Sequence, residues 1–215
     1  MSLIVSLDVD SLKEARRFVR LLKNDVSSFK IGSVLFTSAG PEAVKMVHDE
    51  GGKIFLDLKF HDIPNTVAGA CKAAADLGVF MVNVHASGGL EMLEAARKAI
   101  GTGRSRPLLI GVTVLTSQAR TAKTSPEVVR LAKLCRKSGL DGVVCSPQEI
   151  EKVRKACGKK FVIVTPGIRL SDQNKGDQKR IATPQEAIRR GADYLVIGRP
   201  ILEARDPVQV VRSIR

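Results

Sequence analysis

The chain has 215 residues, 44% of them hydrophobic and 27% charged, so we expect one domain or at most two small ones and exclude disordered and collagen-like classes. No apolar run approaches the roughly 18 residues of a membrane span, and the segment MSLIVSLDVD does not resemble a signal peptide. The net charge of +13 leaves open a nucleic-acid binder, an enzyme for anionic substrates, or a merely basic surface.

Short apolar, β-branched runs alternate with amphipathic stretches along the whole chain. The expected strands are residues 3–7, 28–31, 53–58, 80–84, 107–115, 142–145, 161–165 and 194–197. The expected helices are residues 11–23, 41–50, 66–77, 90–100, 126–138, 147–156, 184–190 and 207–214. Ser11, Ser125, Ser146 and Thr183 stand where helix N-caps belong, and the last three precede a proline.

Continuous apolar strands that alternate with helices indicate a parallel sheet covered by helices. Eight such units in order predict a (β/α)8 barrel that forms a single domain over residues 1–215. An open, doubly wound sheet is the alternative, although no G-x-G-x-x-G follows the first strand. The polar stretch 169–180 follows a strand, and we expect either a loop that closes over the barrel's C-terminal face or an irregular insertion.

Ionisable residues stand at the ends of several expected strands, where barrel enzymes assemble their active sites. These residues are Asp8, Lys30, Asp57, Lys59, His85 and Arg199, with Asp62 just beyond the third strand. Asp57 and Lys59 are two positions apart, so their side chains share one face of the strand. One such pair is most simply a structural ion pair. Four alternating charges, which Lys30 and Asp62 complete, instead indicate a site, because desolvating each charge is costly.

The basic residues are dispersed, without a block of five like charges, which favours a solvated surface over a nucleic-acid footprint. The four cysteines show no C-x-x-C spacing, so we expect reduced thiols and a cytoplasmic protein. His48 lies in a helical pattern, and His61 and His85 lie near the expected site without a third ligand. We therefore expect no metal centre.

The sequence D-L-K-F-H-D-I-P-N-T at residues 57–66 closely resembles the signature of the orotidine 5'-phosphate decarboxylase family. Further segments agree with that family in order: L-D-V at 7–9, F-K-I-G at 29–32, V-H-A-S-G-G at 84–89, V-C-S at 144–146, T-P-G-I-R at 165–169, G-D-Q-K-R at 176–180 and V-I-G-R-P-I at 196–201. D-x-K-x-x-D alone is also found in 3-keto-L-gulonate 6-phosphate decarboxylase and hexulose phosphate synthase. The I-P-N-T continuation and the G-D-Q segment favour the orotidine family.

The resemblance implies decarboxylation of orotidine 5'-phosphate to uridine 5'-phosphate without a cofactor. It makes Lys59 the cation that stabilises the carbanion at C6 and then protonates it, a role that fixed positive charge suits. It places Asp57 beside the substrate carboxylate, where like-charge repulsion acts on the ground state. It also implies a homodimer with shared active sites, in which Asp62 reaches into the partner's site together with Ile63 and Thr66.

The remaining expected site residues hold the ends of the nucleotide. The resemblance assigns Asp8 and Lys30 to the charge network and the ribose hydroxyls, and Ser146 to the pyrimidine amide. Arg199 and Gln178 are assigned to the phosphate, which suits a guanidinium after the eighth strand of a barrel. The set is completed by Pro166 and Gly198.

Two other functions stay open at this point. The first is a magnesium-dependent sugar-phosphate decarboxylase or aldolase-type relative, which activity in the presence of a chelator would separate. The second is a nucleic-acid-binding module, which the net charge of +13 alone motivates. A steep loss of binding with salt would identify the second.

Overall fold

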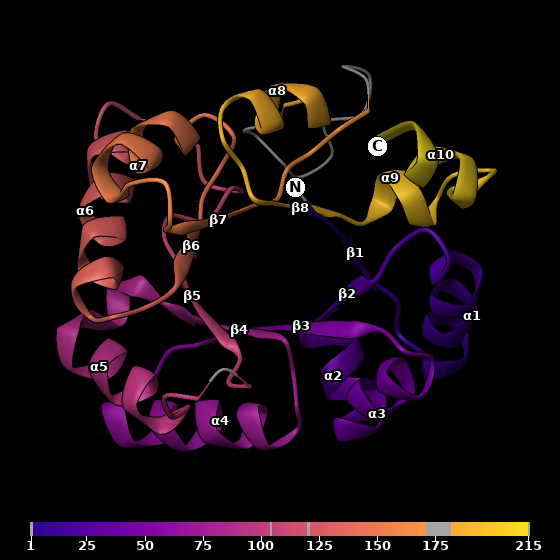
Figure 1. The fold of residues 1–215 in the computed structure, drawn as a ribbon, viewed down its shortest axis with the longest axis horizontal. Coiled ribbons are helices and arrows are strands. Elements are labelled where there is room, and N and C mark those ends of the chain that lie inside the picture. Colours follow the sequence, from indigo (N-terminus) through magenta and orange to yellow (C-terminus); the bar gives the residue numbers. More distant parts are fainter. Residues whose placement is uncertain (1, 104, 120, 171–181, 215) are drawn as a thin grey trace.

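The structure, a computed structural model, describes residues 2–103, 105–119, 121–170 and 182–214. Within these residues, eight parallel strands close into a barrel, which Figure 1 views end-on. The strands are β1 (Ser2–Ser6), β2 (Ser28–Gly32), β3 (Lys53–Phe60), β4 (Met81–His85), β5 (Leu108–Val112), β6 (Gly142–Val144), β7 (Val162–Thr165) and β8 (Tyr194–Ile197). Pairing of β1 with β8 closes the sheet. The predicted (β/α)8 barrel is therefore confirmed, and the open doubly wound alternative is wrong.

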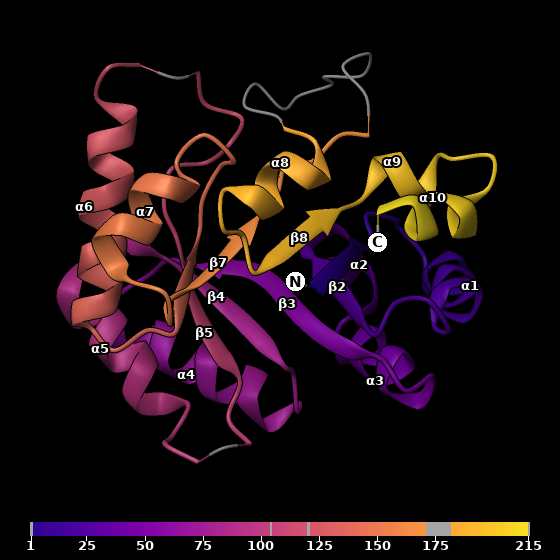
Figure 2. The same ribbon diagram turned by 45° about the horizontal axis from the view of Figure 1, so that its top comes forward.

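Helices form a ring outside the strands, with α4 beside α5 and α6 beside α7 in both views (Figures 1 and 2). They are α1 (Leu12–Leu22), α2 (Ser33–Ala39), α3 (Pro41–Asp49), α4 (Pro64–Asp76), α5 (Gly89–Ala99), α6 (Thr124–Lys137), α7 (Ile150–Cys157), α8 (Pro184–Arg189), α9 (Arg199–Leu202) and α10 (Pro207–Ile214), with a 3-10 turn, η1 (Ala86–Gly88). The sequence did not predict α2, α9 or η1. In the described part of the chain, no helix is long and apolar enough to cross a membrane.

Two of the four predicted N-caps are confirmed. Ser11 Oγ accepts a hydrogen bond of 3.4 Å from a backbone N–H in the first turn of α1. Thr183 Oγ1 accepts one of 3.3 Å from Glu186 N, and Glu186 Oε2 accepts one of 3.0 Å from Thr183 N. This reciprocal capping box satisfies two of the N–H groups that a helix start leaves unpaired, and it fixes where α8 begins.

The other two predicted N-caps are wrong. Ser125 lies inside the first turn of α6, whose N-cap is Lys123. Ser146 precedes a turn rather than a helix, and α7 has Glu149 as its N-cap. The Ser146 hydroxyl accepts a hydrogen bond of 3.2 Å from Gln148 N. Hydroxyl side chains stabilise such turns as readily as helix starts, so a serine before a proline does not distinguish the two.

The barrel interior and the layer between strands and helices form separate apolar cores. The interior core consists of Ile4, Phe55, Met81, Ile110, Val164 and Val196. Neighbouring residues along the same strands, such as Val82 and Ile163, face outward and pack in the layer beneath the helices. The interior core fills the barrel below its C-terminal end, so the space for a ligand lies above it.

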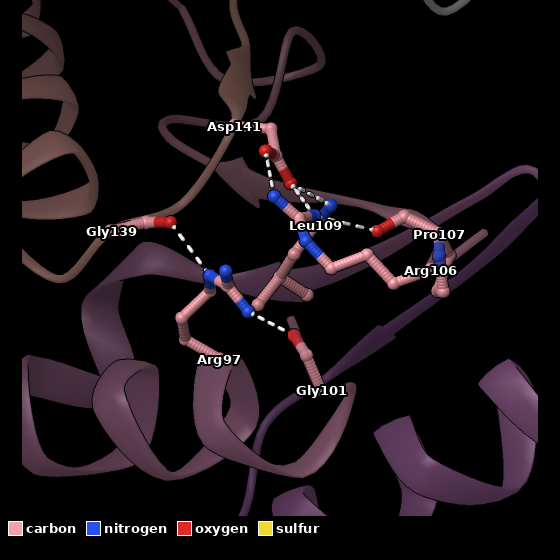
Figure 3. Close-up of polar contacts among 7 residues, drawn as sticks. All are labelled: Arg97, Gly101, Arg106, Pro107, Leu109, Gly139 and Asp141. Atoms are coloured by element: carbon pink, nitrogen blue, oxygen red, sulfur yellow. Dashed lines mark hydrogen bonds and ion pairs between the residues drawn. The ribbon is translucent and has the colours of Figure 1, made fainter. Parts of the chain in front are cut away.

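Ion pairs at the opposite, N-terminal end of the barrel tie strand starts together (Figure 3). Asp141, just before β6, accepts hydrogen bonds from both terminal nitrogens of Arg106, at 2.6 and 2.7 Å, and from Leu109 N at 2.8 Å. Arg97 Nε donates to Gly139 O at 3.1 Å, which braces the same turn. A bidentate pair of this kind has fixed geometry, and with the bond to Leu109 it joins the starts of β5 and β6, while Arg97 links α5 to the same turn.

A similar Arg–Asp ion pair lies two strands further along the chain. Asp193, just before β8, accepts hydrogen bonds from Arg154 at 2.7 Å and from Ile163 N on β7 at 2.8 Å. Both aspartates follow a glycine by two positions, at 139–141 and at 191–193. The repeat places the stabilising ion pairs at one end of the barrel and leaves the other end to the charged residues predicted from the sequence.

Candidate active site

A cavity of about 210 Å³ opens at the C-terminal end of the barrel. Its lining includes the predicted site residues Asp8, Lys30, Asp57, Lys59, Pro166, Gly198 and Arg199. The strands bring together positions that are far apart in sequence, as in the β1–β2 and β2–β3 pairings that align Ser6, Lys30 and Phe55. The cavity therefore lies where the barrel topology predicts an active site.

Four charges alternate in sign across this cavity. Lys30 Nζ lies 3.1 Å from Asp8 Oδ1 and 3.1 Å from Asp57 Oδ2, and Lys59 Nζ lies 2.8 Å from Asp57 Oδ1. The Lys30 and Asp57 side chains are each 11% exposed, whereas that of Lys59 is 36% exposed. Each buried charge thus has a partner of opposite sign, as burial requires, and the Lys59 ammonium keeps access to the cavity.

Burial and ion pairing shift the pKa values of Asp57 and Lys30 in opposite directions. Burial by itself raises the pKa of Asp57, but Lys30, Lys59 and the hydrogen bonds to the carboxylate outweigh it, so the pKa of Asp57 is lowered. Burial by itself lowers the pKa of Lys30, but Asp57 and Asp8 outweigh it, so the pKa of Lys30 is raised. Both residues therefore keep their charges at neutral pH.

The backbone at Lys59 is unusual. Among the described non-glycine residues, Lys59 alone has a positive φ, of 52°. The β3–β4 register shifts between Leu56 and Phe60, so β3 carries a bulge at this place. Bulges near active sites re-aim side chains, and strained backbone at such sites persists only where its surroundings hold it.

One functional side chain was missed by the sequence reading. Asn83 on β4 is fully buried, accepts a hydrogen bond of 2.8 Å from Lys59 N, and donates one of 2.6 Å to Asp57 Oδ1. It also lines the cavity. The available signal was a polar residue at an inward-facing position of the apolar strand M-V-N-V-H, residues 81–85.

Two glycines leave room for the charge network. A Cβ atom at Gly198 would lie 2.8 Å from Asp8 Oδ2 and 3.1 Å from Ser6 Cβ. A Cβ atom at Gly32 would lie 2.8 Å from Lys30 Nζ. Larger residues at either position would displace a charged group, so Gly198 serves the site by the close approach it allows.

Other predicted residues lie away from the cavity. Within the described part of the chain, Asp62, Ile63 and Thr66 are exposed and outside the cavity lining. Asp62 Oδ1 accepts a hydrogen bond of 2.6 Å from Ile63 N. Ser146 is 1% exposed and also outside the lining, so its contact with a pyrimidine stays a prediction. Gln178 lies outside the described residues.

The histidines near the site pair with each other. The rings of His61 and His85 lie 5.3 Å apart between centroids, at 35° to one another. Burial first, then His61 and Lys59, lower the pKa of His85 despite the nearby Asp57. Over the described residues, no group of three or more His, Cys, Asp or Glu side chains is placed to hold a metal ion.

Known proteins resemble this chain over nearly its full length. The family model described as "Orotidine 5'-phosphate decarboxylase / HUMPS family" matches residues 1–214. The chain is 53% identical to the orotidine 5'-phosphate decarboxylase of Pelobacter propionicus, with 99% of this chain and 92% of that protein covered. It is 51% identical to that of Moorella thermoacetica, with 99% and 90% covered.

A solved structure shares both the fold and much of the sequence. The crystal structure of orotidine 5'-phosphate decarboxylase from Lactobacillus acidophilus matches with a TM-score of 0.85 and 38% identity, over 99% of this chain and 96% of that one. The match to the family model and to these relatives covers nearly the full length of the chain. The chain therefore belongs to the orotidine 5'-phosphate decarboxylase / HUMPS family.

Proposed function

We infer that this protein decarboxylates orotidine 5'-phosphate to uridine 5'-phosphate, a step of pyrimidine biosynthesis. The observation that carries the inference is the alternating network of Lys30, Asp57 and Lys59 at the cavity, in a chain at least 51% identical to named orotidine 5'-phosphate decarboxylases. The family model also covers sugar-phosphate enzymes. The names of these relatives favour the nucleotide substrate over that alternative.

The positions of the charges support the following course of the reaction. The bond between C6 of the pyrimidine and its carboxylate breaks, CO₂ leaves, and the electron pair stays on C6. The Lys59 ammonium supplies positive charge where this negative charge develops and then transfers a proton to C6. Asp57 remains an anion beside the departing carboxylate, because Lys30 and Asn83 hold it when the Lys59 proton has moved.

The rest of the substrate is held by residues around the rim. Arg199, at the start of α9, is the proposed phosphate ligand, together with Gln178. Asp8 and Lys30 are proposed to bind the ribose hydroxyls, Ser146 the pyrimidine amide, and Pro166 and Gly198 the walls of the site. Because the phosphate is remote from C6, its binding energy stabilises the transition state at a distance.

The proposal includes a homodimer with shared active sites. Ile63 is 67% exposed and Val34, on α2 after the neighbouring strand β2, is 63% exposed. Exposed apolar side chains mark a contact surface where they form a contiguous patch, and these two residues are proposed to belong to one. Asp62 lies beside Ile63 and outside the cavity of its own chain, as a residue that serves the partner's cavity would. A cytoplasmic location is part of the proposal, supported by Cys71, Cys135 and Cys157, which are buried thiols outside any disulfide.

Turnover of orotidine 5'-phosphate in excess chelator tests the function. Loss of the substrate's ultraviolet absorbance, with one uridine 5'-phosphate formed per CO₂ released, is the expected result. Hexulose 6-phosphate and 3-keto-L-gulonate 6-phosphate, tested with and without magnesium, are the matched controls. Turnover of either sugar phosphate in magnesium, with orotidine 5'-phosphate left unchanged, would assign the chain to the other branch of the family.

A further inference from the structure

We propose that Asn83 is a positioning residue that holds Lys59 and Asp57 in their reacting geometry. Its side chain bridges the two: Oδ1 accepts from Lys59 N at 2.8 Å, and Nδ2 donates to Asp57 Oδ1 at 2.6 Å. Asn83 was not among the site residues expected from the sequence. The inference rests on the proposed decarboxylation and deepens it.

The chemistry of the neighbours fixes how the Asn83 amide points. A backbone N–H can only donate, and an ionised carboxylate can only accept. The carbonyl oxygen of Asn83 must therefore face Lys59, and its NH₂ group must face Asp57. Since Asn83 is 0% exposed, losing either bond would leave a buried polar group without a partner.

The bond to Lys59 supports a backbone that is otherwise unfavourable. Lys59 has a φ of 52° and lies on the bulge of β3. A side chain re-aimed by a bulge keeps its direction only if the bulge keeps its shape. By anchoring the Lys59 N–H from the neighbouring strand, Asn83 determines where the ammonium projects.

The bond to Asp57 matters most once the proton has moved. Asp57 Oδ1 lies 2.8 Å from Lys59 Nζ and accepts a hydrogen bond of 2.6 Å from Asn83 Nδ2. When Lys59 gives up its proton it becomes a neutral amine and attracts the carboxylate less. The amide of Asn83 does not titrate, so it holds Asp57 in place through the whole cycle.

The test compares Asn83→Leu with Val82→Ala. Asn83→Leu keeps a similar volume and removes both hydrogen bonds, whereas Val82 lies one position earlier on β4 and faces the outer core. We expect Asn83→Leu to lower kcat for orotidine 5'-phosphate about 100-fold, with KM and the Kd of uridine 5'-phosphate within threefold of the parent. We expect Val82→Ala to lower the melting temperature and leave kcat within twofold. A kcat for Asn83→Leu within threefold of the parent would overturn the inference.

If Asn83→Leu does not fold, a second variant, Asn83→Asp, tests the same role. Asn83→Asp keeps the shape and the acceptor for Lys59 N but places a carboxylate against Asp57. Two facing carboxyl groups share one proton as pH falls, which restores a donor. The charged groups around this pair are Lys59 on β3, Lys30 on β2, Asp8 after β1 and His85 at the end of β4.

We therefore expect the kcat deficit of Asn83→Asp relative to the parent to shrink as pH falls from 8 to 5.5. A deficit that is constant with pH would contradict a positioning role, because a merely destabilised barrel would show no such profile. The parent's own turnover separates the two claims. If the parent does not decarboxylate orotidine 5'-phosphate, the proposed function fails; if it does and both variants match it, only the role of Asn83 fails.

Discussion

The ammonium of Lys59 lies 2.8 Å from Asp57 Oδ1, yet the two side chains differ sharply in exposure, at 36% for the lysine and 11% for the aspartate. The Lys59 ammonium therefore has access to the cavity while its partner is anchored in the barrel wall. A carboxylate held in this way orients the lysine and also borders the cavity. This division between an accessible acid and a buried, fixed anion is the basis of the mechanism proposed above.

The ion pair between Arg106 and Asp141, at the N-terminal end of the barrel, should affect stability and not catalysis. Asp141→Ala leaves the buried Leu109 N–H without its acceptor and the Arg106 guanidinium with only Pro107 O, so we expect a loss of about 2–4 kcal/mol in the free energy of unfolding. Asp76→Ala removes an exposed pair with Lys72 and should cost less than about 0.5 kcal/mol. Urea unfolding measures the effect on stability, and kcat measures the effect on catalysis. An Asp141→Ala enzyme that loses activity while folded would contradict the separation of the two barrel ends.

Arg199 should act on binding of the phosphate. We expect Arg199→Ala to lower kcat/KM about 10- to 150-fold, the equivalent of one charge-assisted hydrogen bond, mainly through KM. Arg205→Ala, a nearby exposed arginine outside the cavity lining, is the control and should match the parent. Turnover of orotidine, which lacks the phosphate, tests whether the effect of Arg199→Ala depends on that phosphate. If Arg199→Ala slowed turnover of orotidine as much as that of its phosphate, the assigned role would be wrong.

Acid should destabilise the protein partly through His85. Burial, then His61 and Lys59, hold the pKa of His85 below its ordinary value of 6.5. The folded state thus binds the proton less well than the unfolded state, so this contribution to stability is complete above pH 6.5 and is lost as pH falls through the folded pKa. We expect His85→Gln to lose less stability than the parent between pH 7.5 and 5. If urea unfolding showed the same loss in free energy of unfolding for the parent and for His85→Gln over this pH range, this linkage would be contradicted.

The shared site predicts complementation between two inactive variants. Lys59→Ala and Asp62→Ala homodimers should both be nearly inactive, but a mixed dimer has one site with both lesions and one intact site. Random pairing of equal amounts gives about half mixed dimers, so roughly a quarter of parental activity should return. Mass-tagged subunits verify that exchange has occurred. Exchange without recovered activity would mean that Asp62 serves its own chain.

Much of this molecule could be predicted from sequence because its signals are periodic or clustered. Eight apolar runs alternating with amphipathic stretches predicted the barrel, and the D-x-K-x-x-D spacing predicted that Asp57 and Lys59 share a face. Lys30 and Asp8 followed, because charge at a buried strand end needs a partner. The structure brings Lys30, Asp57 and Lys59 together as predicted, but the fourth charge of the network is Asp8. Asp62, which was expected to complete the alternating set, lies outside the cavity lining.

The features that sequence reasoning missed depend on contacts between strands. Asn83 is one polar residue in an apolar strand, and only the β3–β4 pairing shows that it meets Lys59 and Asp57. The bulge that gives Lys59 its positive φ comes from a register shift that local pattern does not reveal. The N-cap prediction at Ser146 failed because a hydroxyl before proline also suits a turn. The one at Ser125 failed because α6 begins one residue earlier, at Thr124.

The most direct measurement of the central claim is turnover of orotidine 5'-phosphate by the parent and by Lys59→Ala, both in excess chelator. The account predicts that the parent forms uridine 5'-phosphate, while Lys59→Ala loses roughly 10³-fold or more in kcat. It also predicts that the folded variant binds uridine 5'-phosphate with a Kd within about threefold to fivefold of the parent's, since Arg199 is unchanged. Lys59→Ala activity within tenfold of the parent would contradict the assignment of Lys59 as the cation and proton donor at C6.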